Sequence, residues 1–314
     1  MKQKSRTEYS VMNTTVAFAA QATAILMGFF TRVVFTRMLS EGYVGINGLF
    51  TDILNILSLS ELGVGTAITY ALYAPIARRD IKKQQILMIM FRTFYRITAG
   101  VVLIAGLCLI PFLDILMKDR PDVDHLIIIY LLYLLNSVVS YLLIYKKTLV
   151  DAHQMNYITV MYHNGFLVLQ DILQIMVLFL TRNFILFLVI AVICTIIGNI
   201  CMSRRADRLF PYLKEPCKEQ LPQEERHDIL RNVKAMLMHK IGNVVVNNTD
   251  NLLISMLIGT AAVGLYSNYL MLSNKLLLIE QIIFSSLVAS IGNVIARDSP
   301  EKRLQIFQAM QSAS

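Results

Sequence analysis

Charged and amide side chains inside long apolar segments are the residues of this sequence that could do chemistry. An ionised side chain at the centre of a bilayer costs about 2.5–3.5 kcal/mol on insertion scales, so it should face a water-filled cavity or a partner helix. The polar residues of four apolar segments each fall on one helical face. These four sets are Thr14, Gln21 and Arg32; Asn47, Thr51, Ser58 and Glu61; Lys240, Asn243, Asn247, Asp250 and Asn251; and Asn274, Gln281 and Ser285.

The four polar faces favour a shared water-filled cavity, and the set from Lys240 to Asn251 favours it most. The alternative is that these side chains hydrogen-bond across dry helix contacts, each worth about 0.6 kcal/mol on average. Asp52 points nearly opposite to Glu61 on its segment. Arg92 and Arg96 leave two alternatives open. They either turn a cationic face to the cavity or extend to the membrane interface, because residues 97–116 alone are long enough to cross.

Motifs for catalysis and cofactor binding are absent from the sequence. It has no Walker-type phosphate loop, no GxSxG elbow and no HExxH, and its five His residues lie without ligand spacing. We therefore expect no enzyme, no cofactor and no metal site. Transport by this chain would use an ion gradient, the membrane potential or the substrate's own gradient.

The composition indicates the elements that must hold these residues. The chain has 314 residues, of which 56% are apolar and 16% charged, and its mean hydropathy is +0.57. Soluble domains carry about 25% charged residues, so we expect an all-α polytopic membrane protein with the lipid bilayer as its partner. The net charge of +8 would suggest nucleic acid in a soluble protein, but the basic residues lie mostly between apolar stretches. We expect no nucleic-acid partner.

About eight transmembrane helices are predicted, since each needs roughly 20 residues to cross the hydrocarbon core. Nineteen Lys and Arg residues fall in one set of alternating loops and four in the other, which predicts a cytoplasmic N-terminus. The only long polar loop predicts a linker at 206–230, between a six-helix bundle at 1–205 and two helices of a second bundle at 231–314. The predicted spans are 11–35, 44–72, 90–116, 125–147, 157–180, 184–203, 236–258 and 268–296.

Two parts of the sequence resemble a known family. The segment RMLSEGYVGINGLFTDILNILSLSELGVGTAITYALYAPIARRD, from Arg37 to Asp80, strongly resembles the second-helix region of bacterial polysaccharide flippases. These are the Wzx-like branch of the multidrug/oligosaccharidyl-lipid/polysaccharide exporter superfamily. Arg32 in FFTRVVF looks like the first-helix arginine of that family. NVVVNNTDNLLIS and GLYSNYLML, at 243–255 and 264–272, look like the opening of its second lobe.

The resemblance implies two helix bundles around a central cavity that opens alternately to each side of the bacterial cytoplasmic membrane. It also implies an undecaprenyl-pyrophosphate-linked glycan as the substrate, moved from the inner to the outer leaflet, with glycosyltransferases and a polymerase of the same pathway as partners. The sequence departs from this pattern by stopping after its eighth span. We expect either a truncated gene or fragment, or a second bundle that another copy completes.

Combined with the polar faces, the resemblance predicts a role for each candidate residue. A cavity that carries Arg or Lys can offset the desolvation of a pyrophosphate. We expect Arg32 and Lys240 to bind the pyrophosphate or a sugar acid, and Arg92 and Arg96 to gather the headgroup at the cytoplasmic mouth. The predicted ligands of sugar hydroxyls are Gln21, Asn47, Asn247 and Asn251, and the predicted proton or sodium sites are Asp250 and Glu61.

Two other functions are kept as alternatives. One is a drug/cation antiporter of the same superfamily, whose cavity should be rich in acidic residues, whereas the membrane-embedded charges here lean basic. The other is a non-transporting membrane scaffold in an envelope polysaccharide assembly complex.

Overall fold

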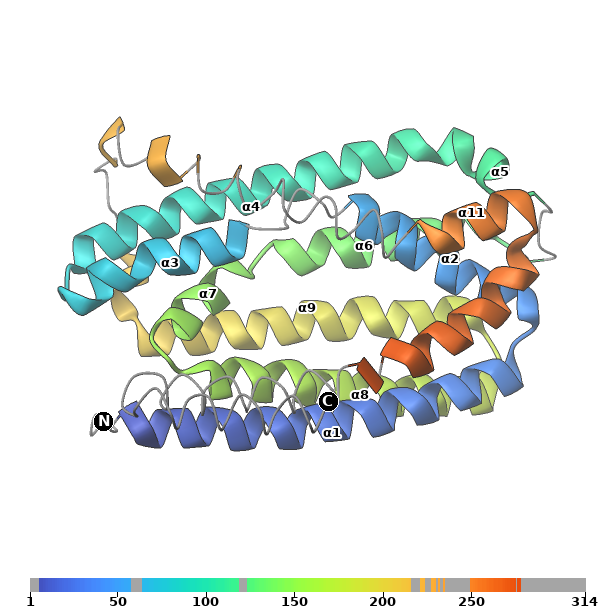
Figure 1. The fold of residues 1–314 in the computed structure, drawn as a ribbon, viewed down its shortest axis with the longest axis horizontal. Helices are drawn as coiled ribbons and strands as arrows, with labels where there is room; N and C mark the ends of the chain where they lie inside the picture. Colours follow the sequence, from blue (N-terminus) through green and yellow to red (C-terminus); the bar gives the residue numbers. More distant parts are fainter. Residues whose placement is uncertain are drawn as a thin grey trace, which may run out of the picture. The chain divides into compact units, whose positions relative to one another are not determined.

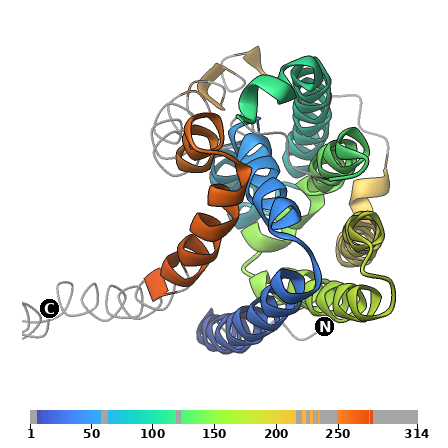
Figure 2. The same cartoon turned by 90° about the vertical axis from the view of Figure 1, so that its right-hand side faces the viewer.

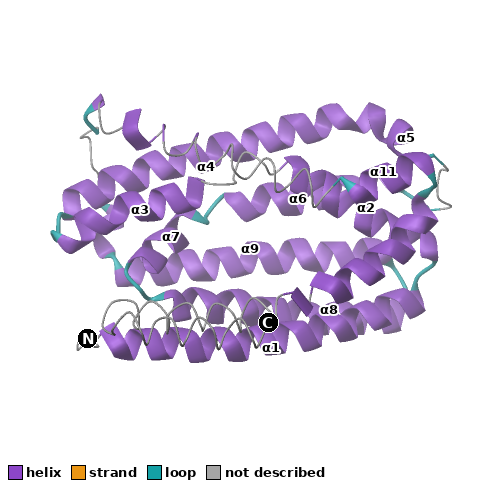
Figure 3. Cartoon of the chain, viewed as in Figure 1, coloured by secondary structure: helices purple, strands orange, loops and turns teal. Residues whose placement is uncertain are grey.

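The computed structural model describes residues 6–57, 64–118, 123–215, 221–223, 227–229, 231, 234, 249–274 and 276–277. Within these residues the protein consists of α-helices, short 3₁₀ turns and connecting loops, with no strand (Figure 3). This confirms the all-α fold expected from the composition. The chain divides into two compact units, Met1–Tyr266 and Ser267–Ser314, and the arrangement of helices given below concerns the first unit.

The first three helices contain the first predicted span and the described parts of the second. Helix α1 (Arg6–Met38) contains the whole of the predicted span 11–35. The predicted span 44–72 is represented by α2 (Glu41–Leu57) and α3 (Val64–Ala77), and the residues between them lie outside the described part.

The third span begins nine residues earlier than predicted. Helix α4 (Ile81–Leu109) begins directly after Asp80, whose Oδ1 accepts a hydrogen bond from the backbone N–H of Lys83 at 2.9 Å. An aspartate cap satisfies one of the free donors at a helix start, so the polar stretch before residue 90 is helical as well. The span continues through the 3₁₀ turn η2 (Ile110–Phe112) into α5 (Leu113–Leu116).

The fourth predicted span, 125–147, is bent in the structure. Helix α6 (Leu126–Tyr141) and helix α7 (Tyr145–Ala152) meet at an angle of 43°. The predicted span is thus formed by two helices joined at a bend, which are long and apolar enough together to count as one span. The bend lets the Lys146 ammonium reach the Asp207 carboxylate at 2.7 Å, and it turns Tyr145 and Leu149 into the core.

The next two spans agree with the predicted 157–180 and 184–203. Helix α8 (Asn156–Thr181) and helix α9 (Phe184–Leu209) are joined by two residues only. Arg182 has a φ of 52°, and the side chain of Asn183 accepts hydrogen bonds from the N–H groups of Ile185 and Leu186 at 2.9 and 3.1 Å. This cap begins α9 immediately after the turn, which makes α8 and α9 a tight hairpin.

The described residues directly after α9 pack against the bundle. In the 3₁₀ turn η3 (Pro211–Lys214), the Tyr212 hydroxyl donates to Gln84 Oε1 of α4 at 2.6 Å, and Gln85 Nε2 donates to the Tyr212 carbonyl. Burial raises the pKa of Tyr212 to about 12. Next to it, the His153 ring lies 4.4 Å from the Phe210 ring, and burial lowers the pKa of this histidine. The residues of the predicted linker that follow α9 are thus packed against α4 and against the loop between α7 and α8.

The predicted loop 259–264 is mostly helix. Helix α11 (Asp250–Leu257) ends near Gly259, whose φ of 140° is in a region that favours glycine. The next helix begins at residue 260, since Ala261 and Ala262 are strong helix formers. Its backbone approaches α2 closely: a Cβ added to Gly45 would collide with the Thr260 carbonyl, and one added to Gly264 would lie 3.1 Å from the Gly45 nitrogen.

The long helices run side by side and expose apolar side chains. Helix α1 packs on α8, α8 on α9, α9 on α6, and α6 on α4 (Figures 1 and 2). Four described helices are long and apolar enough to cross a membrane, and the bent α6–α7 pair makes a fifth if it is one span. Their outer faces carry large exposed apolar residues, for example Phe30, Ile97, Ile104, Phe179 and Leu180. Such surfaces are unusual in water, so the protein is a multi-pass membrane protein.

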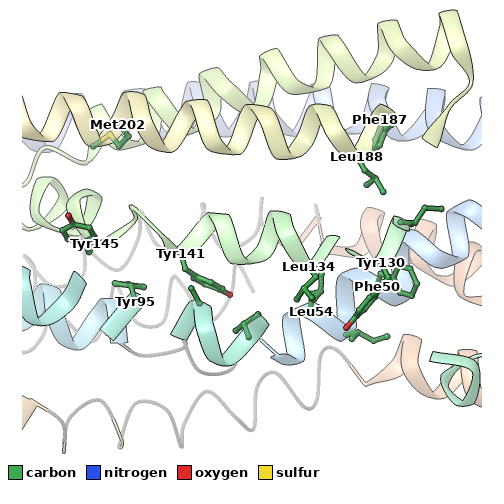
Figure 4. Close-up of a cluster of buried hydrophobic side chains, with 14 of the residues drawn as sticks. Phe50, Leu54, Tyr95, Tyr130, Leu134, Tyr141, Tyr145, Phe187, Leu188 and Met202 are labelled. Atoms are coloured by element: carbon green, nitrogen blue, oxygen red, sulfur yellow. The ribbon is translucent and has the colours of Figure 1, made fainter. Parts of the chain in front are cut away.

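The core lies between α2, α4, α6 and α9 and contains several aromatic rings (Figure 4). The Tyr130 ring packs edge-on against Phe50 at 5.2 Å, and its hydroxyl donates to the Gly106 carbonyl of α4 at 2.9 Å. Gly106 also allows α6 to approach, because a Cβ at this position would meet the buried side chain of Leu134. The close crossing of α4 and α6 therefore depends on a glycine.

We predict that Gly106→Ala destabilises the protein by about 1–3 kcal/mol, the usual cost of overpacking a core. Gly100 is a matched control on the same helix, since a Cβ there would meet nothing within 4 Å. Gly100→Ala should be neutral or stabilising because alanine is the better helix former. Thermal unfolding of the purified variants in detergent measures the difference, and equal melting temperatures for the two variants would contradict the crossing.

Candidate functional site

Arg32 lies at a meeting point of aromatic side chains. It is half-buried on α1, and its guanidinium carbon lies 5.6 Å from the centroid of the Phe35 ring. Around it an aromatic cluster joins α1, α2, α6 and the start of α9, with ring centroids 5.3–6.4 Å apart. The cluster comprises Phe35, Tyr43, Tyr133, Phe184 and Phe187. A guanidinium beside aromatic faces is stabilised by cation–π attraction, which is stronger where water is scarce.

Asn47 belongs to the same region through Tyr133. The Tyr133 hydroxyl of α6 donates a hydrogen bond to Asn47 Oδ1 of α2, and the Tyr133 ring belongs to the aromatic cluster around Arg32. The structure thus brings together two residues that the sequence placed on separate helices. Gln21 is half-buried on α1, but at 1.5 Å per residue it lies about 16 Å along the helix from Arg32.

Asn251 forms a second polar site with Asp52. Asn251 on α11 is 4% exposed, and its Nδ2 donates to Asp52 Oδ2 of α2 at 2.7 Å. The Oδ1 of Asn251 is buried and accepts no hydrogen bond from any residue that the structure describes. Nearby, the Ser255 hydroxyl donates to the Leu116 carbonyl at 2.7 Å, and the Lys118 ammonium donates to the Leu257 carbonyl at 2.8 Å. These bonds fix α11 against α2 and the end of α5.

The remaining candidates lie apart from these two sites or outside the described residues. Asp250 is exposed at the start of α11, where its Oδ2 accepts a hydrogen bond from the Tyr266 hydroxyl at 2.8 Å. Arg92 and Arg96 lie on the exposed face of α4, together with Ile89 and Ile97 and opposite the buried face of that helix. Three predicted site residues lie outside the described residues: Glu61, Lys240 and Asn247.

A cavity of about 230 Å³ lies between α6, α7, α8 and α9. Its polar lining includes Lys147, Tyr162, His163 and Asn199. None of the residues predicted from the sequence lines this cavity.

Sequence reasoning missed Tyr133, Asp52 and Lys147. Tyr133 gave no signal, since a tyrosine in an apolar segment is ordinary. Asp52 did give a signal, because a lone carboxylate in an apolar segment should have a partner. It was left out of the predicted site because it points away from Glu61 and so lies off the predicted polar face. Lys147 lies at the end of a predicted span, where a lysine usually reaches the membrane surface.

We predict that the Asp52–Asn251 hydrogen bond couples the two residues energetically. Asn251→Ala should cost about 1–3 kcal/mol because it leaves a half-buried carboxylate without its amide donor. The Asp52→Ala, Asn251→Ala double variant should lose less stability than the two single variants lose in sum. The difference, which is the coupling free energy, should be about 0.5–3 kcal/mol. Thermal unfolding in detergent measures the cycle, with Asn274→Ala, an exposed position, as the control. Additive effects would show that the pair does not interact.

The comparisons with known proteins give one match. The chain matches the family model described as polysaccharide biosynthesis protein over residues 10–291. No curated protein and no solved structure matches it. The matched range contains both sequence segments that resemble the flippases, so the match confirms that resemblance. Since it covers most of the 314 residues, the chain belongs to the polysaccharide biosynthesis protein family.

Proposed function

We propose that the protein is a flippase that moves lipid-linked oligosaccharide or polysaccharide repeat units from the inner to the outer leaflet by alternating access. The observation that carries the proposal is the half-buried Arg32 beside the Asn47–Tyr133 pair, inside apolar helices of a polysaccharide biosynthesis family member. A cation kept in such surroundings costs free energy. An anionic ligand that passes it offsets that cost.

Arg32 has the chemistry that a lipid pyrophosphate requires. Its guanidinium offers a planar set of donors that binds phosphate oxygens in pairs, and it is more weakly hydrated than an ammonium. Lys240 is proposed as the second cation. Arg92 and Arg96, on the exposed face of α4, are proposed to attract the headgroup before it enters.

The two described asparagines offer complementary groups to sugar hydroxyls. Asn47 uses its Oδ1 to accept from Tyr133, which leaves its Nδ2 as a donor. Asn251 uses its Nδ2 to donate to Asp52, which leaves its buried Oδ1 as an acceptor. A hydroxyl can both donate and accept, so both amides are suited to a sugar. Gln21 and Asn247 are proposed for the same role.

Asp52 joins Asp250 and Glu61 as a candidate for ion coupling. A proton or sodium ion between the Asp52 carboxylate and Asn251 Oδ1, which accepts no hydrogen bond from a described residue, would satisfy both oxygens and change the bond between α2 and α11. The membrane potential supplies about 2.3 kcal/mol per charge per 100 mV to such a step. We propose that the membrane is the bacterial cytoplasmic membrane, as the resemblance implies, and that the N-terminus lies on its cytoplasmic side, as the distribution of Lys and Arg indicates. Glycosyltransferases and a polymerase of the pathway are the proposed partners.

The electrostatic part of the proposal is tested by complementation of a flippase-deficient strain. We expect the Arg32→Ala, Lys240→Ala double variant to lower surface polysaccharide at least tenfold, because each lost charged hydrogen bond is worth about 1.5–3 kcal/mol. The control removes two exposed charges, Arg78 and Lys234, and should complement fully. Wild-type polysaccharide levels from the first variant, at equal expression, would remove Arg32 and Lys240 from the mechanism.

Reconstitution in liposomes separates flipping from the alternative functions. We expect a labelled lipid-linked sugar to become accessible on the opposite leaflet in the presence of the protein, and no efflux of a fluorescent cation. Efflux of the cation without movement of the lipid would indicate an antiporter. Activity in neither assay would indicate a scaffold.

A further inference from the structure

The cavity inside the first unit is built from facing stripes of two antiparallel helices. Helix α8 lines it with residues three and four positions apart, from Thr159 to Gln170, and α9 does so from Cys194 to Met202. At 1.5 Å per residue the α8 stripe is about 16 Å long. The volume of about 230 Å³ is far more than one water molecule needs, and it is large enough for a phosphate group or a sugar ring.

The charge of the lining is one-sided. Lys147 lines the cavity, and none of the lining residues is an aspartate or a glutamate. The adjacent Lys146 is held by Asp207 at 2.7 Å, whereas no described carboxylate lies at ion-pair distance from the Lys147 ammonium. The nearest acid along α7 is Asp151, which does not line the cavity but interacts electrostatically with Lys147 and accepts a hydrogen bond from the lining Thr159 hydroxyl at 2.6 Å.

Neutral donors lie beside this cation. The Tyr162 hydroxyl and the His163 ring, both in the second turn of α8, line the cavity and have no hydrogen bond to another described residue. The Asn199 Nδ2 is used, because it donates to the Val139 carbonyl at 3.3 Å. Lysine, tyrosine and histidine donors that line one cavity, with no carboxylate among the described lining residues, form the kind of set that binds a phosphate.

The lining also changes along its length. Lys147 of α7 and Tyr162 and His163 of α8 line the cavity, Phe166 and Leu167 lie one turn further along α8, and Gln170 lies about one turn beyond them. Gly198 of α9 lets Phe166 pack closely, since a Cβ there would lie 3.1 Å from the ring. A ligand with a charged head, an apolar or ring-shaped neighbouring part and a polar group beyond it matches this order of side chains.

We propose that this cavity binds a phosphate-bearing headgroup, with Lys147 as its counter-ion and Tyr162 and His163 as its hydrogen-bond donors. The site is separate from the proposed transport residues, none of which lines it. The phosphate is carried by a polyprenyl substrate, by a membrane phospholipid or by a soluble phosphate ester. All three present the same oxygens to Lys147.

The test is equilibrium binding to the purified full chain in detergent. The probes are a short-chain polyprenyl pyrophosphate, phosphatidylglycerol and inorganic pyrophosphate. We expect Lys147→Gln to weaken binding about tenfold or more, as loss of a charged hydrogen bond implies, and Lys147→Arg to keep it within about threefold. Arg204→Gln removes an equal charge from an exposed position of α9 outside the cavity and should bind like wild type.

The three probes distinguish the sources of the phosphate. Tighter binding of either lipid than of inorganic pyrophosphate supports the proposal and identifies the lipid, and equal binding of inorganic pyrophosphate supports it with a soluble ligand. Equal affinity of wild type and Lys147→Gln for every probe overturns it, as does the absence of binding to wild type. Folding of the Lys147 variants is checked by their melting temperatures, and retained binding by Lys147→Arg excludes a purely structural role. Because the readout is binding, failure of the Arg32 transport test leaves this result unchanged.

Discussion

The scarcity of water in the bilayer is the constraint on which this structure depends. A polar group inside hydrocarbon must find a partner in the protein, and several side chains here bond to the backbone of another helix. Gln174 Nε2 of α8 donates to the Phe187 carbonyl of α9 at 2.9 Å, and the Tyr130 hydroxyl of α6 donates to Gly106 of α4. These bonds specify which helices are neighbours, since apolar contacts alone barely distinguish one apolar helix from another.

The same constraint explains which parts of the fold could be predicted from the sequence. Long apolar runs must become helices, so α1, α8, α9 and the short turn between the last two follow from hydropathy and capping. The bend between α6 and α7 does not, because no proline or glycine marks it. In the structure the bend is accompanied by an ion pair between Lys146 and Asp207, which lie 61 residues apart in the chain. Helical periodicity is read within one segment, so it cannot detect a contact between two segments.

The candidate site shows the same division between local and distant information. Helical periodicity places Arg32 and Asn47 on polar faces, and the structure connects those faces through Tyr133, which has no polar pattern of its own. Asp52 is on the wrong side of its helix for the predicted cavity, yet it meets Asn251, 199 residues later in the chain. Two residues that are connected through a third residue, or that come from helices far apart in the chain, give no recognisable pattern in the sequence of a single helix.

The contact of Gly45 with Thr260 and Gly264 has a mechanical consequence. At this contact main-chain atoms of the two helices approach each other with the Thr260 and Val44 Cβ atoms beside them, so few side-chain atoms have to disengage when the helices turn. The distance between them is fixed by main-chain atoms, so the softest movement is a rotation about the crossing point. We expect the crossing angle between α2 and the helix that begins at residue 260 to change by rotation about this point of contact.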